Sequence, residues 1–387
     1  MDDWCGVILA GGKGTRLMPL TWDMPKPMIK IANKPMVHYA IDLLRYAGIK
    51  KIIIVVRHLG EKIVEYIEKI DWGIDWGLEI LIPNVDSLDT ADALRKVSNL
   101  IESENIIITM ADIITNMNMK EFMDFSIKKD AFSTVSLLSS DQPKQFGVIV
   151  LNGNQRIRGF LEKPGYDELY LSSLVAKNSL HQHTNLINTG IYYFKREILD
   201  ILNEINLMDF GKNVFPYLLA SDYPVYGYIS NYYWMDAGNP IYYKYTNWDL
   251  LRKWSWPIVP VGEEKEPYKW FENIDTIEFG ENIAIDPHVA IGKGCKIRKG
   301  AVLETLTSIG RNVEIGEGTH IRESVIWDNV KIGKECLIKN SVICDNVEIG
   351  NKVTILENTI IPTNCKITDN VKLENVSLTP DQEVCYD

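Results

Sequence analysis

The sequence lacks the features that mark nucleic-acid-binding, secreted or membrane-spanning proteins. Acidic residues outnumber basic ones by 52 to 41, giving a formal net charge of -11, whereas a nucleic-acid surface usually shows a basic excess. No stretch approaches the roughly 18 consecutive apolar residues needed to span a membrane. The chain opens Met1-Asp2-Asp3, without the basic and apolar regions of a secretory signal. We therefore expect a cytoplasmic protein with no nucleic-acid or membrane partner.

Paired cysteines are also absent. None of the six cysteines forms a Cys-x-x-Cys motif, which argues against a zinc site. Apolar residues make up 46% and charged residues 24% of the chain, as in soluble globular proteins. A length of 387 residues predicts two or three domains, each with its own core.

The first thirty residues carry the strongest chemical signal. A buried-strand pattern, Val7-Ile8-Leu9-Ala10, leads into Gly11-Gly12-Lys13-Gly14-Thr15-Arg16, and Pro25-Lys26-Pro27 follows. Glycines let backbone N–H groups approach a ligand, and successive N–H groups form an anion site. The spacing matches neither the Walker A motif nor the dinucleotide fingerprint. With three cations beside it, the loop predicts a polyphosphate site of another kind, rather than an ordinary strand-to-helix turn.

Short apolar strand patterns alternate with helical ones over the first 138 residues. The predicted strands lie at 6–9, 51–56, 78–82, 105–110 and 132–138, and helices are predicted from 36, 60 and 90. This alternation predicts an α/β fold with a Rossmann-like, mainly parallel sheet, whose ligands lie at the carboxyl ends of the strands. Less regular strands follow up to about residue 233, and Asn239-Pro240 predicts the start of a last helix.

Aliphatic residues recur every six positions in the last third of the chain, from Ile285 to Leu373, with two intervals one residue short. A period of six is typical of a parallel β-helix. Cys295, Cys336 and Cys365 occupy its small inward positions, which favours a core role for them over a metal or redox role. We predict a first domain over 1–253, a proline-containing linker over 254–276 and a β-helix over 277–387.

Two aspartates follow predicted strands. Asp112 comes after Ile106–Ala111, and Asp236 lies in Trp234-Met-Asp-Ala-Gly238. Alone, each would be taken for a turn or N-cap residue. Beside a phosphate loop, the pair predicts a Mg²⁺ site, because Mg²⁺ prefers oxygen ligands and keeps phosphate in its shell.

A predicted hairpin adds residues suited to a sugar phosphate. It is bracketed by Phe146-Gly147-Val148 and Phe160-Leu-Glu162-Lys163-Pro164, and Asn188 precedes a further strand. Lys163 is a point charge suited to phosphate. Glu162 is an acceptor for sugar hydroxyls, and the Asn188 amide could bond a further hydroxyl. The alternative interpretation of Glu162 and Lys163 is a charged hairpin end.

These motifs together resemble the sugar-phosphate nucleotidyltransferases, or nucleotide-sugar pyrophosphorylases, and among them the mannose-1-phosphate guanylyltransferase group and its glucose-1-phosphate relatives. The matching stretches are 9–21, Pro25-Lys-Pro-Met28, Asn33-Lys-Pro-Met36, Phe146-Gly-Val148, Glu162-Lys-Pro164, Asn188-Thr-Gly190 and Trp234-Met-Asp236. The six-residue repeat resembles the left-handed β-helix that many members carry at the C-terminus.

The resemblance implies that an NTP and a sugar 1-phosphate give an NDP-sugar and pyrophosphate. It implies that Arg16 and Lys26 are catalytic and neutralise the phosphates, and that Asp112 and Asp236 hold Mg²⁺. The sugar phosphate is expected at Gly147, Glu162, Lys163 and Asn188. The nucleotide is expected at Leu9, Ala10, Gly11, Gly12, Gly14, Thr15 and Asp89.

The sequence departs from the family at Leu88-Asp89-Thr90-Ala91, where the family usually has Leu-Gly-Thr-Ala. Asp89 would add bulk and negative charge near the nucleotide, so the sequence does not determine which nucleotide base is preferred. It also keeps a second hypothesis, a non-catalytic nucleotide or sugar-phosphate sensor or regulatory subunit. A third, acetyl transfer in the β-helix, is disfavoured because the hexads leave no room for a long loop. The flat faces of a β-helix favour a homo-oligomer.

Overall fold

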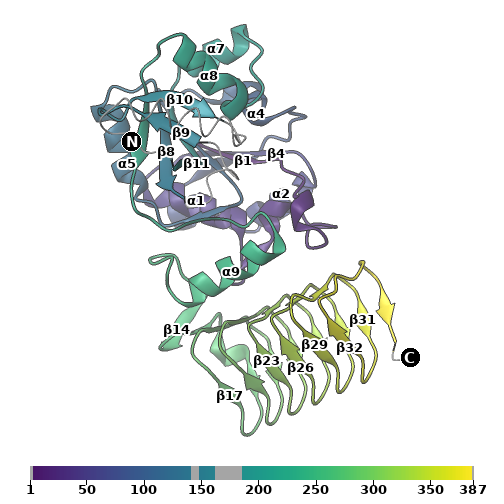
Figure 1. The fold of residues 1–387 in the computed structure, drawn as a ribbon. Helices are drawn as coiled ribbons and strands as arrows, with labels where there is room; N and C mark the ends of the chain where they lie inside the picture. The colour runs from purple at the N-terminus through teal and green to yellow at the C-terminus, as the bar shows by residue number, and fades with distance from the viewer. Residues whose placement is uncertain (1–2, 141–147, 162–184, 386–387) are drawn as a thin grey trace. The chain divides into compact units, whose positions relative to one another are not determined.

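The structure, a computed structural model, describes residues 3–140, 148–161 and 185–385 (Figure 1). By its packing the chain divides into two compact units. The first comprises Met1–Gly12, Tyr39–Ile113 and Met117–Trp234, and the second comprises Lys13–His38, Ile114–Asn116 and Met235–Asp387. The predicted domain limits, 1–253 and 277–387, stay a prediction.

A nine-stranded mixed sheet forms the first unit, in the order β10-β9-β11-β6-β1-β4-β5, with β8 paired to β11 and β12 paired to β8. The strands are β1 (Trp4–Ala10), β4 (Lys51–Val56), β5 (Glu79–Leu81), β6 (Asn105–Met110), β8 (Ser133–Ser139), β9 (Val148–Leu151), β10 (Ile157–Leu161), β11 (Leu186–Lys195) and β12 (Val225–Ile229). The helices along this part of the chain are α1 (Met36–Tyr46), α2 (Gly60–Glu68), α3 (Trp72–Trp76), α4 (Thr90–Lys96), α5 (Met119–Lys128), α7 (Ile198–Glu204) and α8 (Phe215–Ala220).

The central strand β1 is buried because both of its faces are covered. Its residues from Cys5 to Ala10 are buried, and β1 pairs in parallel with β4 on one side and β6 on the other. After β1 the chain continues to β4 on one side of β1, and β6, which comes later in the chain, lies on the other side. Strand order therefore reverses at β1, and the connections that leave β1 and β6 separate at the carboxyl edge of the sheet. The α/β class is confirmed. The strand β11, antiparallel to β6, β8 and β9, makes the sheet as a whole mixed.

The C-terminal part of the second unit is a left-handed β-helix, as predicted. Three sheets of parallel strands form its sides, and equivalent residues of successive coils pair 17 or 18 positions apart, as in Ile297↔Ile315↔Ile332. The isoleucines and the inward cysteines form one buried core. One side consists of β18 (Val289–Ile291), β21 (Thr307–Ile309), β24 (Val325–Ile326), β27 (Val342–Ile343) and β30 (Ile360–Ile361).

The other two sides are built in the same way. One consists of β16 (Glu278–Phe279), β19 (Lys296–Ile297), β22 (Glu314–Ile315), β25 (Lys331–Ile332), β28 (Glu348–Ile349), β31 (Lys366–Ile367) and β33 (Glu383–Val384). The other consists of β17 (Ala284–Ile285), β20 (Val302–Leu303), β23 (His320–Arg322), β26 (Leu337–Lys339), β29 (Thr354–Leu356) and β32 (Lys372–Glu374).

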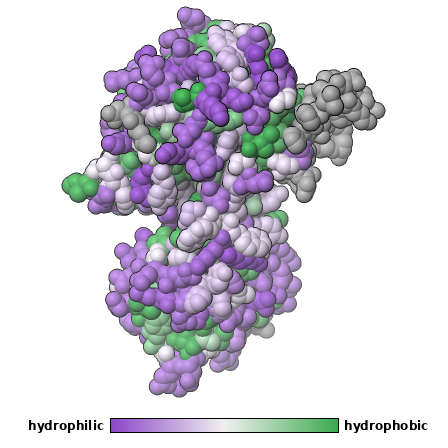
Figure 2. Space-filling view, turned by 90° about the vertical axis from the view of Figure 1, so that its left-hand side faces the viewer, coloured by the Kyte–Doolittle hydropathy of each residue, from purple (hydrophilic) through white to green (hydrophobic). Residues whose placement is uncertain are grey.

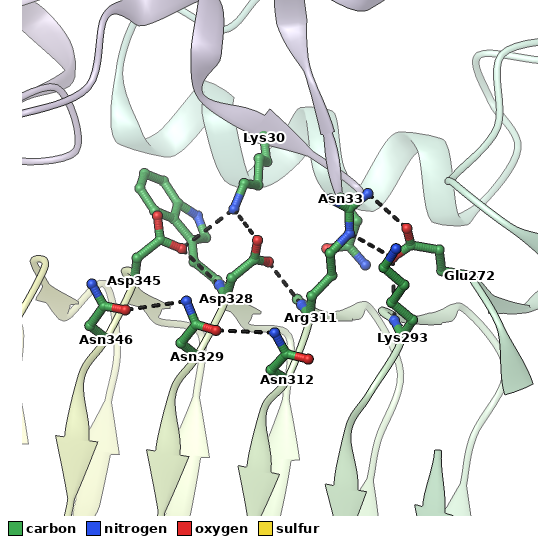
Figure 3. Close-up of polar contacts among 12 residues, drawn as sticks. Lys30, Asn33, Glu272, Lys293, Arg311, Asn312, Asp328, Asn329, Asp345 and Asn346 are labelled. Atoms are coloured by element: carbon green, nitrogen blue, oxygen red, sulfur yellow. Dashed lines mark hydrogen bonds and ion pairs between the residues drawn. The ribbon is translucent and has the colours of Figure 1, made fainter. Parts of the chain in front are cut away.

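The corners of the coil are turned by residues with positive φ. Asn312, Asn329 and Asn346 stand at equivalent corners, with φ between 55° and 60°, a conformation that asparagine tolerates better than most residues. Their side-chain amides form a ladder, with Nδ2 to Oδ1 distances of 3.2 and 3.3 Å (Figure 3). The asparagines therefore both turn the chain and link one coil to the next.

The range predicted as a linker contains regular structure. The strands β14 (Glu263–Glu266) and β15 (Lys269–Phe271) form a hairpin, and β15 pairs in parallel with β18. Helix α9 (Pro240–Leu251) packs on the β-helix side that begins at β15, where Leu251 clusters with Trp270 and Ala290. A small hairpin of β2 (Lys30–Ile31) and β3 (Lys34–Pro35) contacts the same side through the bond of Asn33 to the Ile309 carbonyl. A two-stranded sheet is formed by β7 (Ile113–Thr115) and β13 (Trp234–Asp236).

Helix α9 fixes a buried lysine against this side. The Lys244 side chain donates from Nζ to Oδ1 of Asn358 at 2.7 Å and to the carbonyl of Asn340 at 3.2 Å, and the residue is 4% exposed. Burial lowers the pKa of Lys244 to about 8, against the raising effect of Glu357 and Glu323. Folding therefore places this ammonium where it holds its proton less tightly than in the unfolded chain.

We expect the contribution of Lys244 to stability to rise with pH. Between pH 8 and the ordinary pKa of a lysine side chain, the unfolded chain keeps this proton and the folded chain loses it. The free energy of unfolding therefore increases with pH. The increase from about pH 7.5 to about pH 9.5 should be about 2 kcal/mol. Urea unfolding of the wild type and of Lys244→Met at the two pH values measures it. The same increase in both proteins would contradict the expectation.

Among the described residues, no helix is long and apolar enough to cross a membrane. Figure 2 shows one face of the molecule, on which hydrophilic residues predominate and apolar residues form small separate groups. One β-helix side carries outward charges that alternate in sign along the register from Glu278 through Lys296, Glu314, Lys331, Glu348 and Lys366 to Glu383. Each rung thus places a cation beside an anion, which suits a solvated surface.

Candidate active site

Three predicted site residues of the first unit lie at the carboxyl edge of its sheet. Leu9 of β1 pairs with Met110 of β6, and Gly11 and Asp112 each stand two residues further along their own strand's exit. The strand β11 runs antiparallel to β6, which brings Asn188, near its start, to the same edge. The structure thus places the start of the glycine loop, an aspartate and an amide at one edge of the sheet.

Asn188 is already engaged within the protein. Its Oδ1 accepts from the N–H of Gly190 at 3.0 Å, and its Nδ2 donates to the hydroxyl of Tyr192 at 2.8 Å. These bonds hold the amide in one orientation, half-buried, where β11 shifts register against β8. One amide hydrogen remains for a further acceptor.

Asp89, which replaces the usual glycine of the family, is the N-cap of α4. Its carboxylate accepts from the N–H of Thr90 at 2.9 Å, and its backbone is extended, a conformation open to any residue. Partial burial, with the nearby Asp209, raises the pKa of Asp89. Helix α4 leads into β6, so its N-terminus lies at the same edge of the sheet as Gly11.

Replacing Asp89 by asparagine should improve nucleotide binding. The asparagine carbonyl keeps the N-cap bond, while one negative charge is removed from the edge of the sheet where the nucleotide is expected. Two unit charges about 4 Å apart in water interact by about 1 kcal/mol, so the KM for the nucleotide should fall about fivefold if Asp89 faces it. Steady-state kinetics measure it, with Asp75→Asn on exposed α3 as control. An unchanged KM would show that Asp89 does not face the nucleotide.

The second unit brings three further predicted residues together. Lys26, in a short 3₁₀ helix (Lys26–Met28), is buried, and its Nζ donates to Oδ1 of Asp236 at 3.0 Å. The Arg16 guanidinium lies 3.8 Å from the other carboxylate oxygen, with its side chain 73% exposed. Lys26 is therefore a fixed positive charge, whereas the Arg16 side chain has solvent around it in which to reach a ligand.

Two glycines pack closely around this cluster. At Gly14, φ is +65°, and a Cβ would come within 2.9 Å of Thr21 Cγ2 and 3.0 Å of Lys26 Cβ. At Gly238, a Cβ would lie 3.0 Å from both Asp236 carboxylate oxygens. The hydroxyl of Thr21 also donates to the carbonyl of Gly14 at 2.8 Å. Sequence analysis missed Thr21 and Gly238, although Gly238 stands only two residues after Asp236.

Other predicted residues are placed only in part. Leu9 and Ala10 are buried at the end of β1, Gly12 is exposed in the loop, and Thr15 is exposed at the start of a short 3₁₀ helix (Thr15–Leu17). Gly147, Glu162 and Lys163 lie outside the described residues. Among the residues that the structure describes, no group of three or more His, Cys, Asp or Glu side chains could hold a metal.

Comparison with known proteins finds relatives for both parts of the chain. Residues 5–252 match the nucleotidyl transferase family, and residues 272–373 match the left-handed β-helix (LbH) domain of the EIF2B epsilon subunit. The first match covers more than half of the chain. A solved structure from Bacillus anthracis, provisionally named a glucose-1-phosphate thymidylyltransferase and in complex with a sucrose, shares the fold, with a TM-score of 0.53 and 21% identity over 63% of this chain and 94% of that one.

Several curated proteins are similar over most of their length. A UTP–glucose-1-phosphate uridylyltransferase of Synechocystis is 29% identical, covering 83% of this chain and 82% of its own. Mannose-1-phosphate guanylyltransferases of Mycobacterium tuberculosis and Arabidopsis thaliana are 28% and 29% identical, each over 83% of this chain and 79% and 85% of their own. With its glycine loop, its Lys26–Asp236 pair and its C-terminal β-helix, the chain belongs to the nucleotidyl transferase family.

Proposed function

We propose that the protein transfers a nucleotidyl group from an NTP to a sugar 1-phosphate, forming an NDP-sugar and pyrophosphate. The observation that carries the proposal is the buried Lys26 ammonium, held on Asp236 beside Arg16 within the segment that follows the glycine loop. The names of the relatives favour mannose 1-phosphate with GTP, or glucose 1-phosphate with another nucleotide, as the substrates.

In this reaction a phosphate oxygen of the sugar phosphate attacks the α-phosphorus and pyrophosphate leaves. The protein forms no covalent bond, so its residues act by positioning and by neutralising charge. Lys26 is already oriented by Asp236, so its charge needs little reorganisation as the transition state forms. Arg16, with a longer and more exposed side chain, is suited to follow the departing pyrophosphate.

We propose Mg²⁺ as the metal, with Asp112 and Asp236 as its protein ligands. Mg²⁺ is commonly held by one or two carboxylates together with substrate phosphates, and the described residues offer carboxylates but no larger protein cage. Bound there, Mg²⁺ would neutralise phosphate charge and orient the leaving group.

Removing the metal should therefore abolish the activity. With excess EDTA, pyrophosphate release should fall to background, and added Mg²⁺ should restore it. Binding of the NTP should also weaken in EDTA, because the phosphates lose the cation that they coordinate. Equilibrium dialysis measures this binding. Full activity in EDTA would overturn the assignment of a metal.

The proposed function is tested by incubating the purified chain with each NTP in turn, Mg²⁺ and either mannose or glucose 1-phosphate, and measuring pyrophosphate. We expect one pair to react far faster than the others. No release with any pair, from folded protein, would overturn the proposal. It would favour the alternative of a nucleotide-sensing or regulatory subunit, which the charged Asp89 at the N-terminus of α4 supports.

A further inference from the structure

The segment that carries Lys26 is bonded to the β-helix only a few residues later. The Lys30 ammonium lies 2.6 Å from Oδ2 of Asp328 and 3.4 Å from Oδ1 of Asp345 (Figure 3). Asp328 and Asp345 stand at equivalent corners of successive coils. The three side chains are each 20% exposed or less, so water screens their attraction only weakly.

The two carboxylates are themselves held in place by the coil. Oδ1 of Asp328 accepts from the N–H of Arg311 at 2.8 Å, and Oδ1 of Asp345 accepts from the N–H of Asp328 at 2.8 Å. Burial raises the pKa of Asp345, and the Lys30 charge opposes that rise. The β-helix thus presents Lys30 with a rigid pair of anions.

The main chain of the same segment is fastened as well. Tyr243 donates its hydroxyl to the Lys30 carbonyl at 2.9 Å and accepts from Nε1 of Trp327 at 2.8 Å. At the hairpin turn, Nδ2 of Asn33 donates to the Ile309 carbonyl at 2.7 Å. Side chain, carbonyl and turn are therefore each bound to the β-helix or to α9.

Little freedom remains between Lys26 and Lys30. The N–H of Ile29 bonds the Lys26 carbonyl at 3.1 Å, closing the short 3₁₀ helix, and Pro25 and Pro27 fix φ at two positions. A displacement of Lys30 would therefore be passed on to Lys26. Since Lys26 meets Asp236 within the same unit, it would also change the geometry of that ion pair.

We propose that Lys30 is a positioning residue: through Asp328 and Asp345 it fastens the Lys26 segment to the β-helix, so that the β-helix fixes the phosphate-binding ammonium. The catalytic consequence rests on the proposed function, whereas the fastening itself does not. A misplacement of about 1 Å lowers the rate of a positioned reaction by about a hundredfold, so loss of the fastening should lower kcat by tenfold or more.

The test compares two variants with the wild type. Lys30→Met removes the cation but leaves two buried anions unpaired, which threatens folding. A triple variant, Lys30→Met with Asp328→Asn and Asp345→Asn, removes all three charges, and each asparagine Oδ1 can still accept its backbone N–H. Lys331→Met is the matched control, because Lys331 pairs with Glu348 at 2.9 Å on an exposed side of the same β-helix.

Hydrogen–deuterium exchange of the amides of residues 26–31 is the first measurement. We expect exchange there to be about tenfold faster in the triple variant and unchanged in Lys331→Met. The second measurement is a kinetic split: kcat should fall tenfold or more while the KM for the sugar phosphate changes less than twofold, and Lys30→Arg should recover part of kcat. A merely structural residue would not separate kcat from KM.

The outcomes distinguish the two claims. Unchanged exchange over residues 26–31 in the folded triple variant overturns the inference, whatever the activity. Faster exchange with an unchanged kcat overturns the positioning role. If the wild type releases no pyrophosphate with any substrate pair, the proposed function fails, and exchange alone then decides whether Lys30 fastens the segment.

Discussion

Replacing Lys26 by alanine should lower kcat/KM for pyrophosphate release about a thousandfold, the cost of removing one preorganised charge from a transition state. The Lys26 ammonium is buried and held 3.0 Å from Asp236, so no water or neighbouring side chain can take its place without rearrangement. The loss should appear mainly in kcat, because the charge matters most where negative charge develops. Steady-state kinetics with the preferred substrate pair measure it.

The control is a lysine lost from a similar ion pair elsewhere. Lys331→Ala removes the same charge from an exposed pair with Glu348, and its activity should stay within twofold of the wild type. Near-ultraviolet circular dichroism checks that Lys26→Ala is folded. A folded Lys26→Ala protein with wild-type kcat/KM would remove this lysine from the catalytic machinery and, with it, the observation on which the proposed function rests.

The β-helix was the most predictable part of the molecule. Its repeat is local, because each six-residue side begins with a buried aliphatic residue, and pairs such as Ile297↔Ile315 need only constant spacing. The two short intervals contain the corners at Glu323 and Asn340, which have a positive φ like the other corners of the coil. The start of the coil was harder to predict, because β15 falls among prolines and charged residues that are typical of a linker.

The first unit was predictable where strands are buried on both faces and less so elsewhere. The predicted strands at 51–56 and 105–110 match β4 and β6, whose residues are almost all apolar. Helix α5 was missed, although Asn118 caps it and Glu121 stands three residues on, a recognisable N-terminal signal. The antiparallel direction of β11 in the sheet is set by its pairing with strands that are distant in the sequence, and no local pattern reveals that pairing.

The residues of the candidate site could be named from the sequence, but their contacts could not be predicted. The sequence singled out Lys26 and Asp236 separately, and their ion pair joins positions 210 residues apart. The sequence did not single out Lys30, because its partners lie 298 and 315 residues away, at corners whose periodicity gives no hint of charge pairing. Long-range ion pairs follow from how the hairpin of β2 and β3 packs on the coil.

Replacing Gly333 by alanine should destabilise the β-helix by at least about 3 kcal/mol. Gly316, Gly333 and Gly350 stack on successive coils, and a Cβ on Gly333 would lie 2.4 Å from the Gly350 carbonyl oxygen and 2.5 Å from its carbon. These are backbone atoms, so relief requires two coils to separate and breaks the ladder between β25 and β28. Urea unfolding followed by circular dichroism measures the loss.

Gly318→Asn is the matched control, because it changes a glycine of the adjacent coil that has space around it. At Gly318 φ is +62° and the nearest atom to an added Cβ is Cγ of Glu335 at 3.9 Å. Glu335, Lys352 and Asn370 occupy the equivalent corners of later coils with φ between 56° and 64°, so asparagine should cost less than about 1 kcal/mol. Equal losses in the two variants would mean that φ, rather than the close approach of coils, explains the glycines. A small loss in Gly333→Ala would show that the coils can move apart.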